Sequence, residues 1–278
     1  GAAQRAISTI DIAAWDIIAR ARDLPLHQLL GESATGTVPC YASGGYYWND
    51  VDPVEKVVDE VSGYVDAGFD AVKIKIGRLS LEEEIRRVRA AREVLGPDRL
   101  LMLDANNAWA DADSAIRDIH QLAEFDPFWI EEPLIPDDMR GHAEIREAVR
   151  VPIATGEIEA TRWGFAELLD LNTAQMLQPD AAVLGGITEF SRVAHMATEK
   201  NIPLYPHWFH QLHVSLAASL PPVVMVEYFA DFLVFNFGAL LEETGAPVNG
   251  QLPVPQQAGI GLRFDDDAVN RYAVDDWS

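Results

Sequence analysis

Cysteine is almost absent from this sequence. Cys40 is the only one in 278 residues, which excludes an intrachain disulfide. That scarcity fits a reducing compartment, so the cytoplasm is the expected location. Long apolar runs are also missing, since none approaches the roughly 20 residues of a membrane span. The first residues lack the basic, apolar and small-residue order of a secretory signal. We therefore expect no membrane partner.

Basic residues are scarce as well. The chain has 21 lysines and arginines against 44 acidic residues, which gives a net charge of −23. Such a surface repels nucleic acid and anionic membranes, so we expect no nucleic-acid partner. An anionic substrate would require positive charge concentrated at one place in the fold.

The sequence does contain a regular alternation of short strand-like runs and helical segments between about residues 38 and 228. The strand-like runs are 38–42, 71–77, 100–103, 128–130, 152–155, 174–177, 202–205 and 223–226. Alternation of this kind is typical of a parallel sheet, and eight units favour closure into a barrel. We therefore predict an α/β fold, a (β/α)8 TIM-like barrel with parallel strands over residues 37–245.

Two further segments flank the predicted barrel. Residues 1–36 contain an amphipathic helix from Ile7 to Arg22. Its apolar residues near helical spacing are Ile7, Ile10, Ala14, Ile17 and Ile18. Residues 246–278 begin with a proline- and glycine-rich stretch of little periodicity. We expect this C-terminal segment to be an ordered extension that packs over the barrel.

The second predicted strand carries two lysines in an otherwise apolar run. Residues two apart share a face of a strand, so Lys73 and Lys75 point inward if Val72, Ile74 and Ile76 pack outward against helices. A buried ammonium is costly unless carboxylates surround it. Either those carboxylates exist, or the lysines lie on an exposed strand face.

Ionisable residues follow successive predicted strands. Each of them has a simpler explanation on its own, such as a helix cap, a solvated turn or a core histidine. Seven ionisable residues, each at the carboxyl end of a different predicted strand, are much harder to explain by coincidence. In a barrel these ends form one mouth, where active sites of this fold lie. The seven residues are Lys75, Asp104, Glu131, Glu157, Asp180, His207 and Glu227.

The chemistry of these residues is coherent. Asp104, Glu131 and Glu157 supply carboxylates from three adjacent strands. Hard oxygen ligands without nearby cysteine or histidine favour Mg²⁺, with Mn²⁺ as the alternative. Lys75 and His207 lie on either side of these carboxylates in strand order. The sequence therefore predicts two bases that flank a divalent metal.

The neighbours of the two bases fit such roles. Asp180 is placed to orient the His207 imidazole, which fixes the tautomer and raises basicity. Lys73 adds positive charge that lowers the pKa of Lys75, and a protonated Glu227 donates a hydrogen bond to a substrate oxygen. Two bases beside a metal suit removal of the proton α to a carboxylate, because the metal stabilises the enediolate. The expected substrate is a small-molecule carboxylate.

The motifs at these positions resemble the mandelate racemase group of the enolase superfamily. They are Lys73-Ile74-Lys75, Asp104-Ala105-Asn106, Trp129-Ile130-Glu131-Glu132-Pro133, Gly156-Glu157, Gln178-Pro179-Asp180 and His207. The resemblance covers nearly the whole chain. Muconate-lactonizing relatives place a lysine late in the barrel, at a position that lies within Gln178-Pro179-Asp180 here. That segment has no lysine, which separates this chain from them.

The resemblance implies a role for each residue. Lys75 is the base on one face of the substrate, and His207, paired with Asp180, acts on the other. The implied Mg²⁺ ligands are Asp104, Glu131 and Glu157. The implied contacts to the substrate are Lys73 and Asn106 at its carboxylate or at oxygens beside the metal, and Glu227 as an electrophilic hydrogen-bond donor.

Family members also carry an N-terminal α+β capping domain whose loops select the substrate. By resemblance, residues 1–36 correspond to the end of that domain, so we expect most of it to be missing from this chain. The aromatic residues Tyr46, Tyr47 and Trp48 after the first strand either line the substrate pocket or form a packed loop or a subunit contact.

Three functions remain open at this point. The leading hypothesis is a Mg²⁺-dependent acid-sugar dehydratase that yields a 2-keto-3-deoxy acid. The alternative within enzymes is a racemase or epimerase of a 2-hydroxy acid. A catalytically silent barrel, kept as a scaffold, is the alternative from another class. A homo-oligomer is expected in each case.

Overall fold

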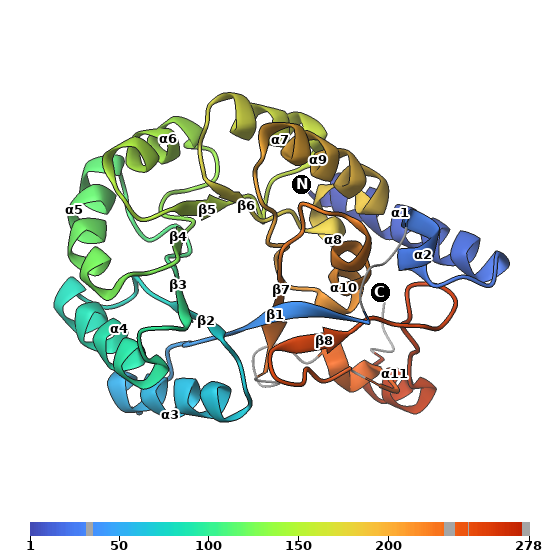
Figure 1. The fold of residues 1–278 in the computed structure, drawn as a ribbon, viewed down its shortest axis with the longest axis horizontal. Coiled ribbons are helices and arrows are strands. Elements are labelled where there is room, and N and C mark those ends of the chain that lie inside the picture. Colours follow the sequence, from blue (N-terminus) through green and yellow to red (C-terminus); the bar gives the residue numbers. More distant parts are fainter. Residues whose placement is uncertain (32–35, 231–236, 244, 274–278) are drawn as a thin grey trace.

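The computed structural model describes residues 1–31, 36–230, 237–243 and 245–273. Seven parallel strands curve around a central axis and helices form an outer layer (Figure 1). The strands are β1 (Thr37–Gly44), β2 (Ala71–Lys75), β3 (Leu100–Asp104), β4 (Trp129–Glu131), β5 (Ile153–Thr155), β6 (Met176–Leu177) and β7 (Val226–Phe229). Parts of all three predicted units, at 32–35, 231–236, 244 and 274–278, lie outside the described residues. The unit boundaries themselves stay predictions.

The ring closes through one residue. The strands pair in the order β6-β5-β4-β3-β2-β1-β7. Leu204 makes parallel bridges to Leu177 in β6 and to Val223 just before β7, and these join the two ends of the sheet. Eight chain segments therefore form the barrel, which confirms the predicted fold class.

Two of the predicted strands were placed or sized wrongly. The run 202–205 forms only the bridges at Leu204, because Pro203 and Pro206 lack the N–H groups that a longer ladder needs. The strand predicted at 223–226 lies too early in the chain, because β7 begins at Val226, the last residue of that run. Glu227 is consequently the second residue of β7 instead of the residue after a strand.

Helices link the strands and cover the barrel. Local sequence starts several of them: Asp52 accepts the N–H groups of Val54 and Glu55, and Ser80 forms a reciprocal capping box with Glu83. The helices between β1 and β6 are α3 (Pro53–Asp66), α4 (Leu81–Leu95), α5 (Ala112–Leu122), the short 3-10 helix η1 (Ala123–Phe125), α6 (Met139–Ala148) and α7 (Thr161–Asp170). Those after β6 are α8 (Ala181–Leu184), α9 (Gly186–Lys200) and α10 (His210–Ser219).

The lysine strand is oriented as its alternation predicts. Val72, Ile74 and Ile76 are buried in the core between the barrel and its helices. Lys73 points into the barrel and is only 1% exposed, with its ammonium 5.6 Å from the ring centroid of Tyr41. The inward orientation of the lysines is therefore confirmed, and the exposed-face interpretation is wrong for Lys73.

The N-terminal segment forms α1 (Ala2–Ala21) and α2 (Leu26–Leu30), and the longer helix packs with an unexpected face. Asp11 accepts hydrogen bonds from the N–H and hydroxyl of Thr188 on α9, and Ser8 accepts one from Gly185 N–H. The isoleucines of the predicted apolar face are exposed, by 51%, 71%, 66% and 42% at Ile7, Ile10, Ile17 and Ile18. Polar contacts and the packing of Ile12 and Trp15 on the core thus attach α1 to the barrel, on a face other than the predicted apolar stripe. No helix among the described residues has the length and hydropathy to span a bilayer.

The C-terminal segment adds η2 (Phe237–Leu240), β8 (Gln251–Pro253) and α11 (Asp266–Tyr272). β8 pairs antiparallel with the first residues of β1, Thr37–Pro39, a pairing that the weak periodicity of this segment did not predict. The contact lies at the end of the barrel opposite the carboxyl ends of the strands.

Candidate active site

The predicted site residues meet at the carboxyl ends of the strands. Lys75, Asp104 and Glu131 are the last residues of β2, β3 and β4, and the parallel register pairs Lys75 with Asp104 and Asp104 with Glu131. Glu157 follows β5 by two residues, Asp180 follows β6 by three, and His207 lies three residues beyond Leu204. Register alone therefore brings the first three side chains next to one another.

Three carboxylates form a compact ligand set. Asp104, Glu131 and Glu157 each offer an oxygen, and these oxygens all lie within 4.8 Å of one another. The first two side chains are fully buried. Burial and the neighbouring carboxylates raise the pKa of Glu131 to about 8 and also raise that of Glu157. A divalent cation offsets such crowded negative charge, so the donor set fits Mg²⁺.

Two lysines accompany the carboxylates. Lys73 Nζ lies 2.6 Å from Glu131 Oε1, 2.7 Å from Glu227 Oε1 and 3.5 Å from Asp104 Oδ2. Lys75 Nζ lies 2.5 Å from Asp104 Oδ2 and is partly open to solvent. These two ammonium groups offset part of the negative charge of the carboxylates around them.

The predicted pKa direction of Lys75 is wrong for this structure. Burial and Lys73 both disfavour its ammonium, yet the Asp104 carboxylate holds the pKa of Lys75 above its usual value. The attraction of the Asp104 carboxylate in contact outweighs the repulsion by Lys73. Lys75 is therefore charged while Asp104 has no other cationic partner as close.

His207 and Asp180 form the predicted pair. Nδ1 of His207 lies 3.0 Å from Asp180 Oδ2, and Nε2 lies 3.6 Å from Glu157 Oε2. Burial lowers the pKa of His207, but the hydrogen bond that it donates to Asp180 and the charges of Glu157 and Glu227 outweigh burial and raise the pKa to about 9. Lys75 thus stands at the Asp104 end of the carboxylate set and His207 at the Glu157 end.

Glu227 is ionised here, unlike the predicted protonated donor. Its Oε2 accepts the backbone N–H of Trp208 at 2.6 Å, and Oε1 pairs with Lys73. Burial alone would raise the pKa of Glu227, but the charges of Lys73 and His207 lower it to about 2. Asn106 lies two residues beyond β3 with an exposed side chain, and its N–H donates to Asp104 Oδ1 at 3.0 Å.

Sequence reasoning missed Glu132 as a site residue. It is 1% exposed, and neither carboxylate oxygen has a hydrogen-bond partner among the described residues. Burial and the charges of Glu157, Asp104 and Glu131 raise the pKa of Glu132 to about 9. Strand alternation turns Glu132 away from Glu131, but a positive φ of 42° breaks the alternation. The Glu-Glu-Pro sequence was the available signal.

The aromatic residues after β1 divide between the two interpretations left open above. The Tyr46 ring centroid is 5.4 Å from Lys75 Nζ, so this residue borders the site. Tyr47 is packed between loops, where its hydroxyl donates to Glu84 Oε1 at 2.5 Å. Trp48 is 39% exposed, and the Lys56 ammonium lies over its ring, 5.8 Å from the ring centroid.

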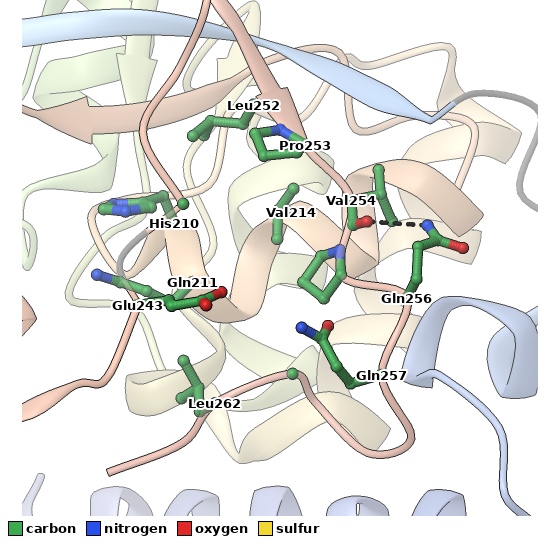
Figure 2. A pocket seen from close by; sticks show the side chains of 13 residues that line it. His210, Gln211, Val214, Glu243, Leu252, Pro253, Val254, Gln256, Gln257 and Leu262 are labelled. Atoms are coloured by element: carbon green, nitrogen blue, oxygen red, sulfur yellow. Dashed lines mark hydrogen bonds between the residues drawn. The ribbon is translucent and has the colours of Figure 1, made fainter. Parts of the chain in front are cut away.

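A cavity of about 300 Å³ lies elsewhere, between α10 and the C-terminal segment (Figure 2). Its walls include Val214, Leu252 and Glu243, and none of the nine predicted site residues lines it. One of its polar groups, the Gln256 amide, already donates to Val254 O at 2.9 Å. The ionisable cluster at the barrel mouth therefore remains the candidate active site.

Two family models match the chain. The model described as "Enolase C-terminal domain-like" matches residues 56–268. The model for the mandelate racemase/muconate lactonizing enzyme N-terminal domain matches residues 2–31, which contain α1 and α2. These matches agree with the resemblance drawn from the motifs.

Curated relatives cover nearly all of the chain. It is 35% identical over 268 residues to the L-talarate/galactarate dehydratase of Salmonella typhimurium, covering 96% of this chain and 65% of that protein. It is 37% identical over 275 residues to the 3,6-anhydro-α-L-galactonate cycloisomerase of Streptomyces coelicolor, covering 99% and 73%. The chain thus spans about two thirds of the first relative's length.

A solved structure supports the same relationship. The Salmonella typhimurium dehydratase, liganded with Mg and L-lyxarohydroxamate, superposes with a TM-score of 0.88 at 34% identity. The superposition covers 97% of this chain and 66% of that chain.

Proposed function

This chain belongs to the mandelate racemase/muconate lactonizing enzyme family of the enolase superfamily, and we propose that it is a Mg²⁺-dependent acid-sugar dehydratase. The observation that carries the proposal is the position of Lys75 and His207 at opposite ends of one carboxylate set. Two groups able to move protons, with a cation site between them, suit removal of an α-proton and loss of a β-hydroxyl.

Asp104, Glu131 and Glu157 would hold the metal. When bound, Mg²⁺ would offset their charge and stabilise the negative charge that develops on the substrate carboxylate. Lys73 and Asn106 bind that carboxylate from the protein side. The fully buried Lys73 also balances Glu227 and Glu131, which keeps these acids in place beside the substrate.

Lys75 and His207 divide the proton transfers. Asp104, engaged as a metal ligand, would hold the Lys75 ammonium less strongly, so that Nζ can release its proton to solvent. The neutral Nζ then accepts the α-proton from its face of the substrate. His207 donates a proton from Nε2 to the departing β-hydroxyl, and Asp180 keeps Nδ1 protonated. Glu227, ionised next to Lys73, keeps the Lys73 ammonium charged and oriented beside the substrate carboxylate.

The product of this reaction is a 2-keto-3-deoxy acid. The dehydratase relative supports an acid sugar as the substrate class. The test is a screen of mono- and diacid sugars with the full-length protein and Mg²⁺, with keto acid trapped as its semicarbazone. We expect Mg²⁺-dependent semicarbazone from at least one acid sugar. The absence of keto acid from every sugar, with intact Mg²⁺ binding, would contradict the proposal.

A racemase or epimerase is the second candidate, and the same two-sided arrangement favours it. If Lys75 removes a proton from one face and His207 returns one to the other, a 2-hydroxy acid is inverted without loss of water. Product analysis separates the two, because inversion gives no keto acid. A silent scaffold need not bind Mg²⁺, so calorimetric titration with Mg²⁺ tests that alternative, and Mg²⁺ binding counts against it.

A further inference from the structure

A buried ion pair on α4 lies outside the group of residues assigned to the chemistry. Glu84 and Arg87 are 3% and 1% exposed, and Arg87 Nη1 lies 2.8 Å from Glu84 Oε2. Replacing a buried ion pair by apolar residues is often neutral for stability, so the pair needs a reason beyond stability. Its other contacts supply one.

Arg87 binds the backbone at the ends of two barrel strands. Nη1 donates to the carbonyl of Lys75 at 2.9 Å, and Nη2 donates to the carbonyl of Gly45 at 2.8 Å. Lys75 ends β2, and Gly45 directly follows β1. One planar guanidinium therefore sets the spacing between the residue that carries the proposed base and the loop that carries Tyr46.

Glu84 holds the loop that follows β2. Its Oε1 accepts the backbone N–H groups of Gly77, Arg78 and Leu79 at 2.9, 3.1 and 3.0 Å. Three amides that converge on one oxygen leave this loop little freedom. The backbone on the C-terminal side of Lys75 is thus fixed by Glu84, and the carbonyl of Lys75 itself by Arg87.

Tyr46 is fixed from both of its neighbours. The Gly45 carbonyl is bound by Arg87, and the ring of Tyr47 lies 4.2 Å from the Arg87 guanidinium carbon. The Tyr47 hydroxyl donates to Glu84. Between these two anchors, the Tyr46 ring stays beside the Lys75 ammonium.

We propose that Glu84 and Arg87 are positioning residues that hold the Lys75 ammonium and the Tyr46 ring in place at the barrel mouth. This inference rests on the proposed function, in which Lys75 takes the α-proton. Misplacing a catalytic group by about 1 Å costs up to about 100-fold in rate. Loss of Arg87 therefore slows transfer of the α-proton to Lys75 and leaves the rate of proton transfer to His207 unchanged.

Arg92 offers a matched control on the same helix. It donates to the carbonyls of Phe125, Gly96, Arg99 and Asp126. These carbonyls precede β3 and β4, so Arg92 ties backbone at the opposite end of the barrel. Arg87→Met and Arg92→Met remove the same kind of group from α4, and only the first touches the mouth.

The first experiment measures exchange of the α-proton in D2O with galactarate as the probe, in full-length protein. In the His207→Asn background, where Lys75 is the proposed base, Arg87→Met should lower exchange about tenfold or more. In the Lys75→Ala background, Arg87→Met should change the exchange rate by less than about twofold. The control Arg92→Met should change the exchange rate by less than about twofold in both backgrounds. Equal losses in the two backgrounds would overturn the proposal. If Arg87→Met fails to fold, Arg87→Lys takes its place, because one ammonium cannot reach both carbonyls and Glu84.

The second experiment does not depend on activity. Trypsin cleaves after the exposed Arg78 only when the loop opens, and mass spectrometry identifies that cut. We expect Arg87→Met and Glu84→Gln to speed this cut about tenfold and Arg92→Met to leave it unchanged. Equal cleavage in all variants would overturn the proposal. If the wild type exchanges an α-proton of no acid sugar in the screen, the proposed function is wrong, and this cleavage alone decides whether Glu84 and Arg87 hold the loop.

Discussion

Nδ1 of His207 lies 3.0 Å from Oδ2 of Asp180, and this contact decides which nitrogen of the imidazole faces the carboxylate set. A proton on Nδ1 donates to Asp180, so Nε2 is left at the side of Glu157. Asp180 is itself held, because its Oδ1 accepts the N–H of Ala182 at the start of α8. The orientation of His207 thus depends on the first turn of a helix.

Asp180→Asn should lower dehydration by about 100-fold or more, because an amide cannot hold the same tautomer or stabilise the imidazolium. Exchange of an α-proton that faces Lys75 should persist. The matched control is Asp111→Asn, which alters the exposed N-cap of α5, a residue outside the predicted site. Kinetics in H2O and exchange in D2O check the prediction, and loss of both reactions together would contradict it.

His207→Asn should abolish dehydration and still exchange α-protons that face Lys75, because each base reaches only one face of the substrate. Lys75→Ala should remove that exchange. Proton NMR in D2O, followed for several acid sugars, is the measurement. Equal loss of exchange in both variants on every substrate would leave an enzyme with a single base.

Glu157→Gln should weaken Mg²⁺ binding by about tenfold or more and abolish turnover without unfolding the protein, because an amide oxygen carries no charge. Calorimetric titration with Mg²⁺ measures the affinity. Glu159→Gln is the control, since Glu159 lies two residues further on and outside the ligand set. Wild-type affinity in Glu157→Gln would show that the ligand assignment is wrong.

Removing Mg²⁺ should make stability fall as pH rises from about 7 to 9. The raised pKa values of Glu131, Glu132 and His207, about 8, 9 and 9, mean that the folded state keeps protons that the unfolded state has lost. Their stabilisation is therefore present at low pH and lost through this window, with a slope of about 1.4 kcal/mol per pH unit for each retained proton.

Below about pH 7, titration of the buried His27, His142 and His213 makes the free energy of unfolding rise with pH, because their pKa values are lowered in the folded state. The window above pH 7 avoids their titration. Urea unfolding at pH 7 and pH 9, with Mg²⁺ or with chelator, measures the effect. Mg²⁺ should stabilise the protein more at pH 9 than at pH 7, and a gain that does not increase with pH would contradict the assignment.

Much of the barrel and its mouth follows from local sequence rules. Alternation predicts that Lys73 points inward, and position at strand ends predicts that Lys75, Asp104 and Glu131 meet, because parallel register needs no further information. The strand at Leu204 was overestimated, since flanking prolines limit pairing in a way that apolar content does not reveal.

Other features depend on the folded arrangement. The ionisation of Glu227 and Lys75 depends on which opposite charge lies within about 3 Å, and sequence spacing does not report that. Glu132 faces the site through one positive φ, and periodicity assumes regular backbone. The face of α1 was misjudged because the helix is held through Asp11 and Ser8, which hydrogen-bond to the barrel, and through Ile12 and Trp15, which pack on the core, and not through the isoleucine stripe.

The pairing of β1 with β7 also has a consequence for synthesis on the ribosome. Cys40 pairs with Val226, a separation of 186 residues (226 − 40). At about 5–20 residues per second, β1 waits roughly 10–40 s for this neighbour to be translated. During that time one side of β1 is an open sheet edge, able to pair with a strand of another chain. Stalled translation before β7 therefore leaves an aggregation-prone nascent chain, which a chaperone can protect by covering β1.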